Sequence, residues 1–143
     1  MSLLGSLEIA IRPRMAMVVI FSENLREHLS LQRMLRSSGY DVVATDDPAY
    51  FCQVLTLIHV DLVVMADMAG MSLLRAIRAE GLCDLPAVLI GRAHQVELAA
   101  AARELKAKLY ISNRGELGGF LECVEYEIWP EAFTGMWMSY QPA

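Results

Sequence analysis

The sequence alternates between short apolar runs and longer amphipathic stretches, and this alternation constrains the fold more than any other feature. Residues 15–21 (MAMVVIF) form a continuous apolar run with β-branched members, which is typical of a strand buried on both faces. Residues 25–37 then place apolar side chains on one helical face, and Gly39 is a natural stop for that helix. This first unit predicts a buried strand followed by an amphipathic helix.

The same cycle repeats four more times along the chain. The pattern predicts further strands over residues 41–45, 60–66, 85–90 and 109–112, followed in turn by helices near residues 48–58, 72–80, 94–106 and 117–128. Right-handed crossovers between such units give a parallel sheet covered on both faces. We therefore predict an α/β fold: a flavodoxin-like, doubly wound, five-stranded parallel sheet in the order 2-1-3-4-5, with helices on both faces.

The chain has 143 residues, a length suited to one domain, and it contains no linker rich in Pro, Gly or Ser. We expect residues 15–128 to be this domain, residues 1–14 an N-terminal extension and residues 129–143 a tail too short to be an output domain. The tail carries one charge and four aromatic side chains, those of Trp129, Phe133, Trp137 and Tyr140. It either covers an apolar groove of its own domain or forms an interface with a partner or a second copy, and either role would bury Trp129 and Trp137.

The composition excludes several classes of partner and compartment. The formal net charge is −5 with scattered basic residues, which argues against nucleic-acid binding. No run approaches the roughly 20 apolar residues of a membrane span. The three cysteines, Cys52, Cys83 and Cys123, match neither a zinc motif nor a disulfide framework. We therefore expect reduced thiols and a cytoplasmic location.

Four strings in the chain resemble the receiver domain of two-component response regulators. VVIFSENLREHLSLQRMLRSSGYDVVATDDP is similar to the first β-α-β unit of that family, and DLVVMADMAGMSLLRAIR to its third strand and helix. PAVLIGRA resembles the fourth strand and KLYISNR the fifth. The resemblance covers roughly residues 15–128 and implies a signal-transduction module of the two-component type.

The residues that give such receivers their chemistry are largely replaced here. The family uses an acidic pair that holds Mg²⁺, an Asp that accepts a phosphoryl group, and a hydroxyl and a Lys that bind the phosphoryl oxygens. By resemblance, the acidic pair becomes Ser22-Glu23, the acceptor Ala66, the hydroxyl position Gly91 and the lysine Asn113. The resemblance therefore implies a degenerate receiver, or pseudo-receiver, without phosphoacceptor chemistry.

Asp67 immediately follows the lost acceptor and leaves two interpretations open. Successive strand residues point to opposite faces, so we expect Asp67 to turn away from the site or to cap the next helix. A slip of one residue would instead make Asp67 a substitute acceptor. Glu23 and Asp67 would give at most a weak Mg²⁺ site, and we expect no cofactor.

Tyr110 matches the aromatic switch position of the family, although a static packed ring is equally consistent with the sequence.

The histidines do not change this interpretation. His28, His59 and His94 are dispersed and have no metal-ligand spacing. His28 lies on the first helix, where a phosphorelay role is conceivable, but we expect a surface or partly buried histidine.

We accordingly expect a non-enzymatic module that works by contact with a histidine kinase, another regulator or a second copy. One alternative is a working receiver phosphorylated at Asp67. The other is a small flavodoxin-like enzyme or nucleotide-binding protein, although the chain has neither a G-x-G-x-x-G nor a P-loop string.

Overall fold

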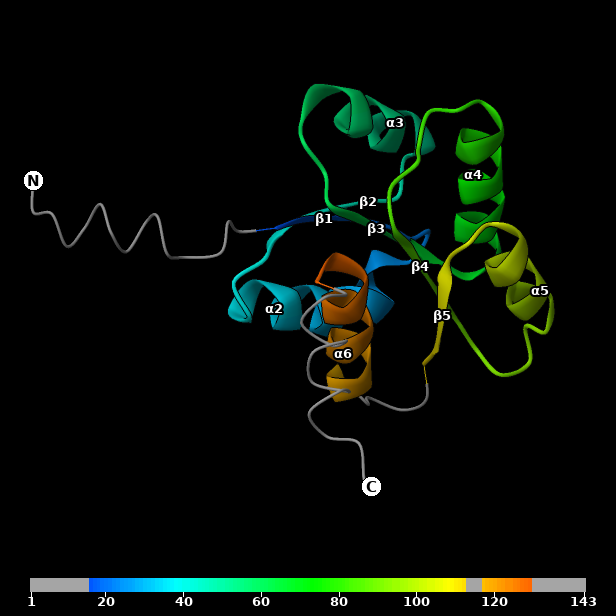
Figure 1. Ribbon diagram of the computed structural model, residues 1–143. Helices are drawn as coiled ribbons and strands as arrows, with labels where there is room; N and C mark the ends of the chain where they lie inside the picture. The colour runs from blue at the N-terminus through cyan, green and yellow to red at the C-terminus, as the bar shows by residue number, and fades with distance from the viewer. Residues whose placement is uncertain (1–15, 113–116, 130–143) are drawn as a thin grey trace, which may run out of the picture.

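The computed structural model describes residues 16–112 and 117–129, and these form one parallel sheet with helices on both faces (Figure 1). The strand order is β2-β1-β3-β4-β5, and every neighbouring pair is parallel. The strands are β1 (Met17–Phe21), β2 (Asp41–Thr45), β3 (Leu62–Ala66), β4 (Ala87–Gly91) and β5 (Lys108–Ile111). The predicted flavodoxin-like fold and its 2-1-3-4-5 order are confirmed.

Helices α2 and α6 cover one face of the sheet, and α3, α4 and α5 cover the other (Figure 1). A short 3-10 turn, η1, precedes α2. The bounds are η1 (Leu25–His28), α2 (Leu29–Ser37), α3 (Pro48–Leu57), α4 (Asp67–Ala79), α5 (Glu97–Glu104) and α6 (Leu117–Ile128). Within the described parts of the chain, we find no helix that combines the length and the apolar content needed to cross a membrane.

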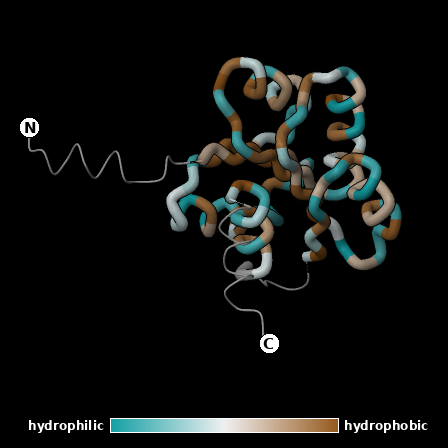
Figure 2. Tube along the Cα trace, viewed as in Figure 1, coloured by the Kyte–Doolittle hydropathy of each residue, from teal (hydrophilic) through white to brown (hydrophobic). Residues whose placement is uncertain are grey.

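The three central strands are buried because both of their faces carry apolar side chains. Their residues form the mostly hydrophobic centre of the trace (Figure 2). Along β1, Val19 and Phe21 pack beneath α3, α4 and α5, whereas Val18 and Ile20 pack beneath α2 and α6. β3 and β4 alternate in the same way. This double burial explains why the sequence reads as continuous apolar runs rather than as alternating ones.

The junction between β3 and α4 differs from the prediction. A helix was expected from about residue 72, but α4 begins at Asp67, directly after the last residue of β3. Gly70 makes this abrupt turn possible, because a Cβ at that position would lie 2.6 Å from the carbonyl carbon of Met65. Asp67 takes the left-handed backbone conformation, with φ of 59°, which non-glycine residues seldom adopt.

Of the C-terminal tail, Trp129 alone lies within the described residues. Its indole Nε1–H donates a hydrogen bond of 3.3 Å to the hydroxyl of Tyr40, which connects the end of α6 to the residue before β2. The side chain nevertheless remains 37% exposed, so the predicted burial of Trp129 is only partial. Phe133, Trp137 and Tyr140 lie outside the described residues, as does the extension at residues 1–14.

We predict that Gly70→Ala destabilises the protein by about 1–3 kcal/mol, the typical cost of an overpacked core, because its methyl group would overlap the backbone of β3. Gly119→Ala in α6 is the matched control, since its Cβ would meet only the Tyr110 ring at 3.4 Å. That control should gain up to about 1 kcal/mol of helix propensity. Urea denaturation of both variants tests the pair. Equal stability changes of the same sign would contradict the close approach of Gly70 to β3.

Candidate functional site

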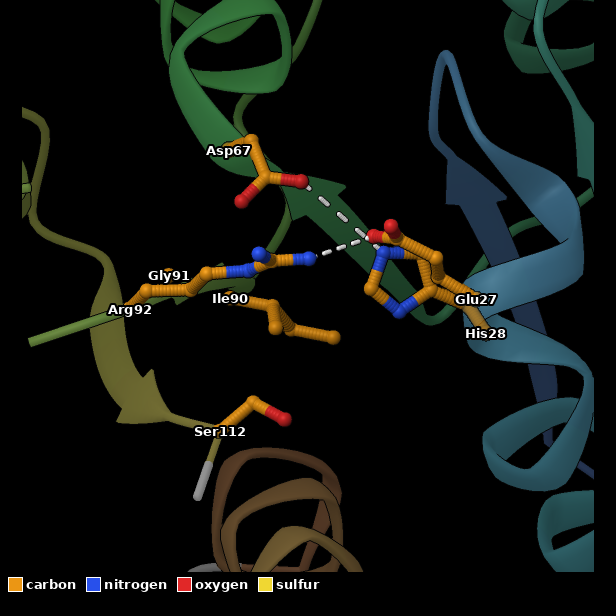
Figure 3. A pocket seen from close by; sticks show the side chains of 7 residues that line it. All are labelled: Glu27, His28, Asp67, Ile90, Gly91, Arg92 and Ser112. Carbon is orange, nitrogen blue, oxygen red and sulfur yellow. Dashed lines mark hydrogen bonds and ion pairs between the residues drawn. The ribbon is translucent and has the colours of Figure 1, made fainter. Parts of the chain in front are cut away.

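A pocket of about 290 Å³ opens at the carboxyl ends of the strands (Figure 3). This is the edge at which open α/β sheets bind their ligands. Its lining residues come from η1, from the start of α4, from the end of β4 and from the residue after β5. They are Glu27, His28, Asp67, Ile90, Gly91, Arg92 and Ser112.

Asp67 points into this pocket, so the expectation that it turns away is wrong (Figure 3). The left-handed conformation of this residue and the immediate start of α4 replace the strand alternation on which that expectation rested. Its Oδ2 lies 4.0 Å from Nε2 of His28. That distance is too long for a hydrogen bond, although the two groups face each other directly.

His28 is the buried member of the pocket, with 6% of its surface exposed. Its Nε2 is inaccessible and has no hydrogen-bond partner. Burial lowers the pKa of this imidazole, since desolvation disfavours the charged form. The negative charges of Asp67 and Glu27 oppose that shift, and the positive charge of Arg92 adds to it. Burial is the largest of these influences, so the net shift of the His28 pKa is downward.

Arg92 extends from the end of β4 across the pocket to η1 (Figure 3). Its Nη2 donates to Glu27 Oε2 at 2.7 Å. The side chains of Arg92 and Glu27 are 53% and 42% exposed. Ion pairs as exposed as this one contribute at most about 1 kcal/mol to the stability of the fold. Glu27 and Asp67 bring two carboxylates to the lining and Arg92 brings one guanidinium, so the formal charges of these three residues sum to −1. The pocket therefore favours a cation over an anion.

The positions that correspond to the acidic pair and the acceptor of the receiver family do not form this pocket. Ser22 is fully buried, and its Oγ accepts a hydrogen bond from the backbone N–H of Asn24 at 3.1 Å. Glu23 is exposed, and Ala66 is buried in the core beneath α2 and α6. None of these three residues lines the pocket. Glu23 and Asp67 are thus not brought together there, and this oxygen set does not fit the Mg²⁺ site that the family uses.

Gly91 lines the pocket, but the space for a side chain at this position is already filled. A Cβ there would overlap the Cδ1 atom of Leu98, a fully buried residue of α5. The Gln95 side chain lies nearby and accepts a hydrogen bond from the backbone N–H of Arg92 at 2.9 Å. Asn113, at the lysine position, lies outside the described residues.

Tyr110 lies on β5 and packs edge-on against Phe120 of α6, with ring centroids 5.6 Å apart. Phe120 is fully buried, whereas Tyr110 is half-buried. The ring of Tyr110 therefore belongs to the contact between the sheet edge and α6.

Sequence reasoning did not propose Glu27 or Arg92 as site residues. It expected His28 to be a surface or partly buried histidine, which is wrong because His28 is buried. Arg92 was accessible to prediction, because it directly follows β4 at the edge where ligands gather. Ser112 follows β5 in the same way. Glu27 and His28 were not accessible in this way, because the 3-10 turn η1 sets their direction, and apolar periodicity does not reveal such a turn.

Comparison with known proteins supports the fold. Neither the known family models nor the curated proteins match the sequence. Among solved structures, a response regulator receiver protein from Pseudomonas putida shares 24% identity at a TM-score of 0.69, covering 81% of this chain and all of that one. A response regulator from Thermotoga maritima shares 21% identity at a TM-score of 0.68, covering 80% of this chain and 98% of that one. The N-terminal receiver domain of a regulator from Bacteroides fragilis shares 18% at 0.70, with the same coverage. This chain therefore has the fold of the response regulator receivers.

We predict that Gly91→Ser, which introduces a hydroxyl at this position, destabilises the protein by about 1–3 kcal/mol. The new Cβ would displace Leu98, whose own truncation in Leu98→Ala should cost about 2–5 kcal/mol. Because the two changes share one space, the double variant should lose less than the sum of the two single losses. A double-mutant cycle by urea denaturation measures this coupling, expected at about 0.5–3 kcal/mol. Simple additivity would show that Leu98 does not fill the space.

Proposed function

We propose that this chain is a receiver-like module of two-component signalling that works by protein–protein contact without accepting a phosphoryl group. The observation that carries this proposal is the state of the acceptor position at the end of β3. Ala66 offers no nucleophile there, and its side chain is packed in the core instead of lining the pocket. On this proposal the chain has no enzymatic activity of its own.

The electrostatics of the pocket support the same conclusion. Phosphoryl transfer depends on cationic groups that stabilise the charge of the transferring group. Here a transferred phosphoryl group would meet the carboxylate of Glu27, and the guanidinium of Arg92 is already paired with that carboxylate. Gly91 supplies no hydroxyl, and Leu98 occupies the space where one would lie.

The surface and the cysteines fit a module that binds other proteins inside the cell. Several large apolar side chains are exposed and are available for contact with a partner. They include Tyr50, Leu57, Ile58, Leu82, Val96, Tyr126 and Trp129. Cys52, Cys83 and Cys123 are all free, which fits the reducing cytoplasm. The partner on this proposal is a histidine kinase, another regulator or a second copy of the chain.

The position of Asp67 favours one alternative, a working receiver phosphorylated at that residue. Its carboxylate is 32% exposed and points into the pocket. The alternative has to place a phosphoryl group in the pocket that Glu27 also lines, where Arg92 and Ser112 are the lining residues that could donate hydrogen bonds to it.

We predict that the protein forms no acyl phosphate. Incubation with Mg²⁺ and acetyl phosphate, followed by intact mass measurement, should give no stoichiometric adduct. Beryllofluoride should cause no saturable shifts of amide NMR signals. A stoichiometric adduct that is lost in Asp67→Asn and kept in Asp84→Asn would overturn the proposal and establish the alternative. Asp84 is the matched control because it precedes β4 and lines a separate pocket at the opposite end of the sheet.

We further predict that Ala66→Asp does not restore phosphorylation. Ala66 is 1% exposed, and an ionised carboxylate in such an apolar core is strongly disfavoured. The variant should lose stability on urea denaturation and should remain unlabelled by acetyl phosphate. Circular dichroism would verify that the sample is folded at the labelling temperature. Rapid labelling of the folded variant would show that residue 66 has access to the pocket.

A further inference from the structure

His28 has a polar atom that the fold leaves without a partner. The side chain is 8% exposed, and its Nε2 is inaccessible and makes no hydrogen bond. Such buried, unsatisfied atoms are rare and call for an explanation, and a bound ion is one such explanation. The atom is directed towards Asp67 at the pocket, with Oδ2 at 4.0 Å (Figure 3).

Two carboxylates converge on the same point. One ligand atom each from Glu27, His28 and Asp67 lies within 4.8 Å of the others. We propose that these three residues bind a first-row divalent ion of the Zn²⁺ class, with the fourth position open to water or to a donor from a partner protein. This inference goes beyond the proposed function and does not depend on it.

To bind such an ion, the two carboxylates would have to move closer to Nε2 of His28, which is the fixed ligand. At metal–ligand distances of about 2.0–2.2 Å, two ligand atoms of a tetrahedral ion lie roughly 3.4 Å apart. The buried imidazole of His28 is held in place by its surroundings. The carboxylates of Asp67 and Glu27 are 32% and 42% exposed, so they are the groups that would have to move inward. The ion would then provide the missing partner of Nε2.

The donor set selects the class of metal. Mg²⁺ prefers an octahedron of oxygen ligands and retains several waters. An imidazole nitrogen among the ligands instead suits Zn²⁺ and related first-row ions such as Co²⁺ and Ni²⁺, and Zn²⁺ also accepts carboxylate oxygens. The pocket lining has a net charge of −1, which also favours a cation.

Arg92 competes with the proposed ion for the carboxylate of Glu27. Its guanidinium binds the carboxylate of Glu27 at 2.7 Å, so metal binding has to displace it from that carboxylate. Removing the guanidinium frees a ligand and removes a positive charge from the pocket. The proposal therefore requires Arg92→Gln to bind metal more tightly than the wild-type chain.

The chain also supplies a matched control histidine. His59 pairs with Asp61 at 2.9 Å, but its side chain is 62% exposed, and no third ligand joins the pair among the described residues. A metal that merely associates with surface histidines and carboxylates would use this pair as readily as the pocket.

The test is a titration of the full-length protein at neutral pH. Co²⁺ binding is followed by its visible absorption, and Zn²⁺ binding by competition with a chromogenic chelator. We expect one ion per chain, with no thiolate-to-cobalt charge-transfer band. His28→Gln and Asp67→Asn should each weaken binding at least about 100-fold, since residues that only support a ligand are already worth about 10–100-fold. His59→Gln should bind like the wild-type chain.

Each contrary outcome is decisive. The site is wrong if the His28 and Asp67 variants bind as the wild type does, if a thiolate band shows that the cysteines hold the ion, or if no saturable binding occurs. Weaker binding in Arg92→Gln would contradict the competition with Glu27, and displacement by equimolar Mg²⁺ would contradict the assigned metal class. Circular dichroism checks the fold of each variant. If His28→Gln does not fold, Asp67→Asn and Glu27→Gln decide the question.

Discussion

The direct joining of β3 to α4 is the constraint on which the rest of the site depends. Gly70 brings the first turn of α4 against the backbone of Met65, so no loop separates the strand from the helix. Asp67 then takes a left-handed conformation and directs its carboxylate into the pocket. With a loop at this junction, strand alternation would determine which way the residue after Ala66 points. One close approach between a helix and a strand therefore determines which acidic group the pocket contains.

The fold could be predicted because its information is local and repeated. Continuous apolar runs identify strands buried on both faces, and each amphipathic stretch that follows identifies a crossover helix. Right-handed crossovers then leave few arrangements for five such units. The predicted ends of the helices and strands were less accurate than their existence, because periodicity does not specify where a helix or strand stops. The helix expected at residues 94–106, for example, is confined to Glu97–Glu104.

The site was harder to predict because its geometry is set by features that leave no periodic trace. The 3-10 turn η1 directs Glu27 and His28 towards the pocket, and a positive φ turns Asp67 towards them. These residues are separated by about 40 positions in the sequence, so no spacing rule connects them. The resemblance to receivers correctly identified the edge of the sheet at which the pocket lies, namely the carboxyl ends of the strands. It also directed attention to Glu23 and Ala66, neither of which lines the pocket.

The contact between Gly91 and Leu98 has a consequence for how this sequence can change over generations. A side chain at position 91 and a leucine at position 98 exclude each other, so the effect of either substitution depends on the state of the other. A lineage that acquired a hydroxyl at position 91 would first pass through a less stable protein, whichever change came first. A sequence with a hydroxyl at position 91 and a smaller residue at position 98 differs from the present one at only two sites. Each single change on the way to it would lower the stability of the protein. The packing of one leucine thus makes a hydroxyl at position 91 difficult to acquire.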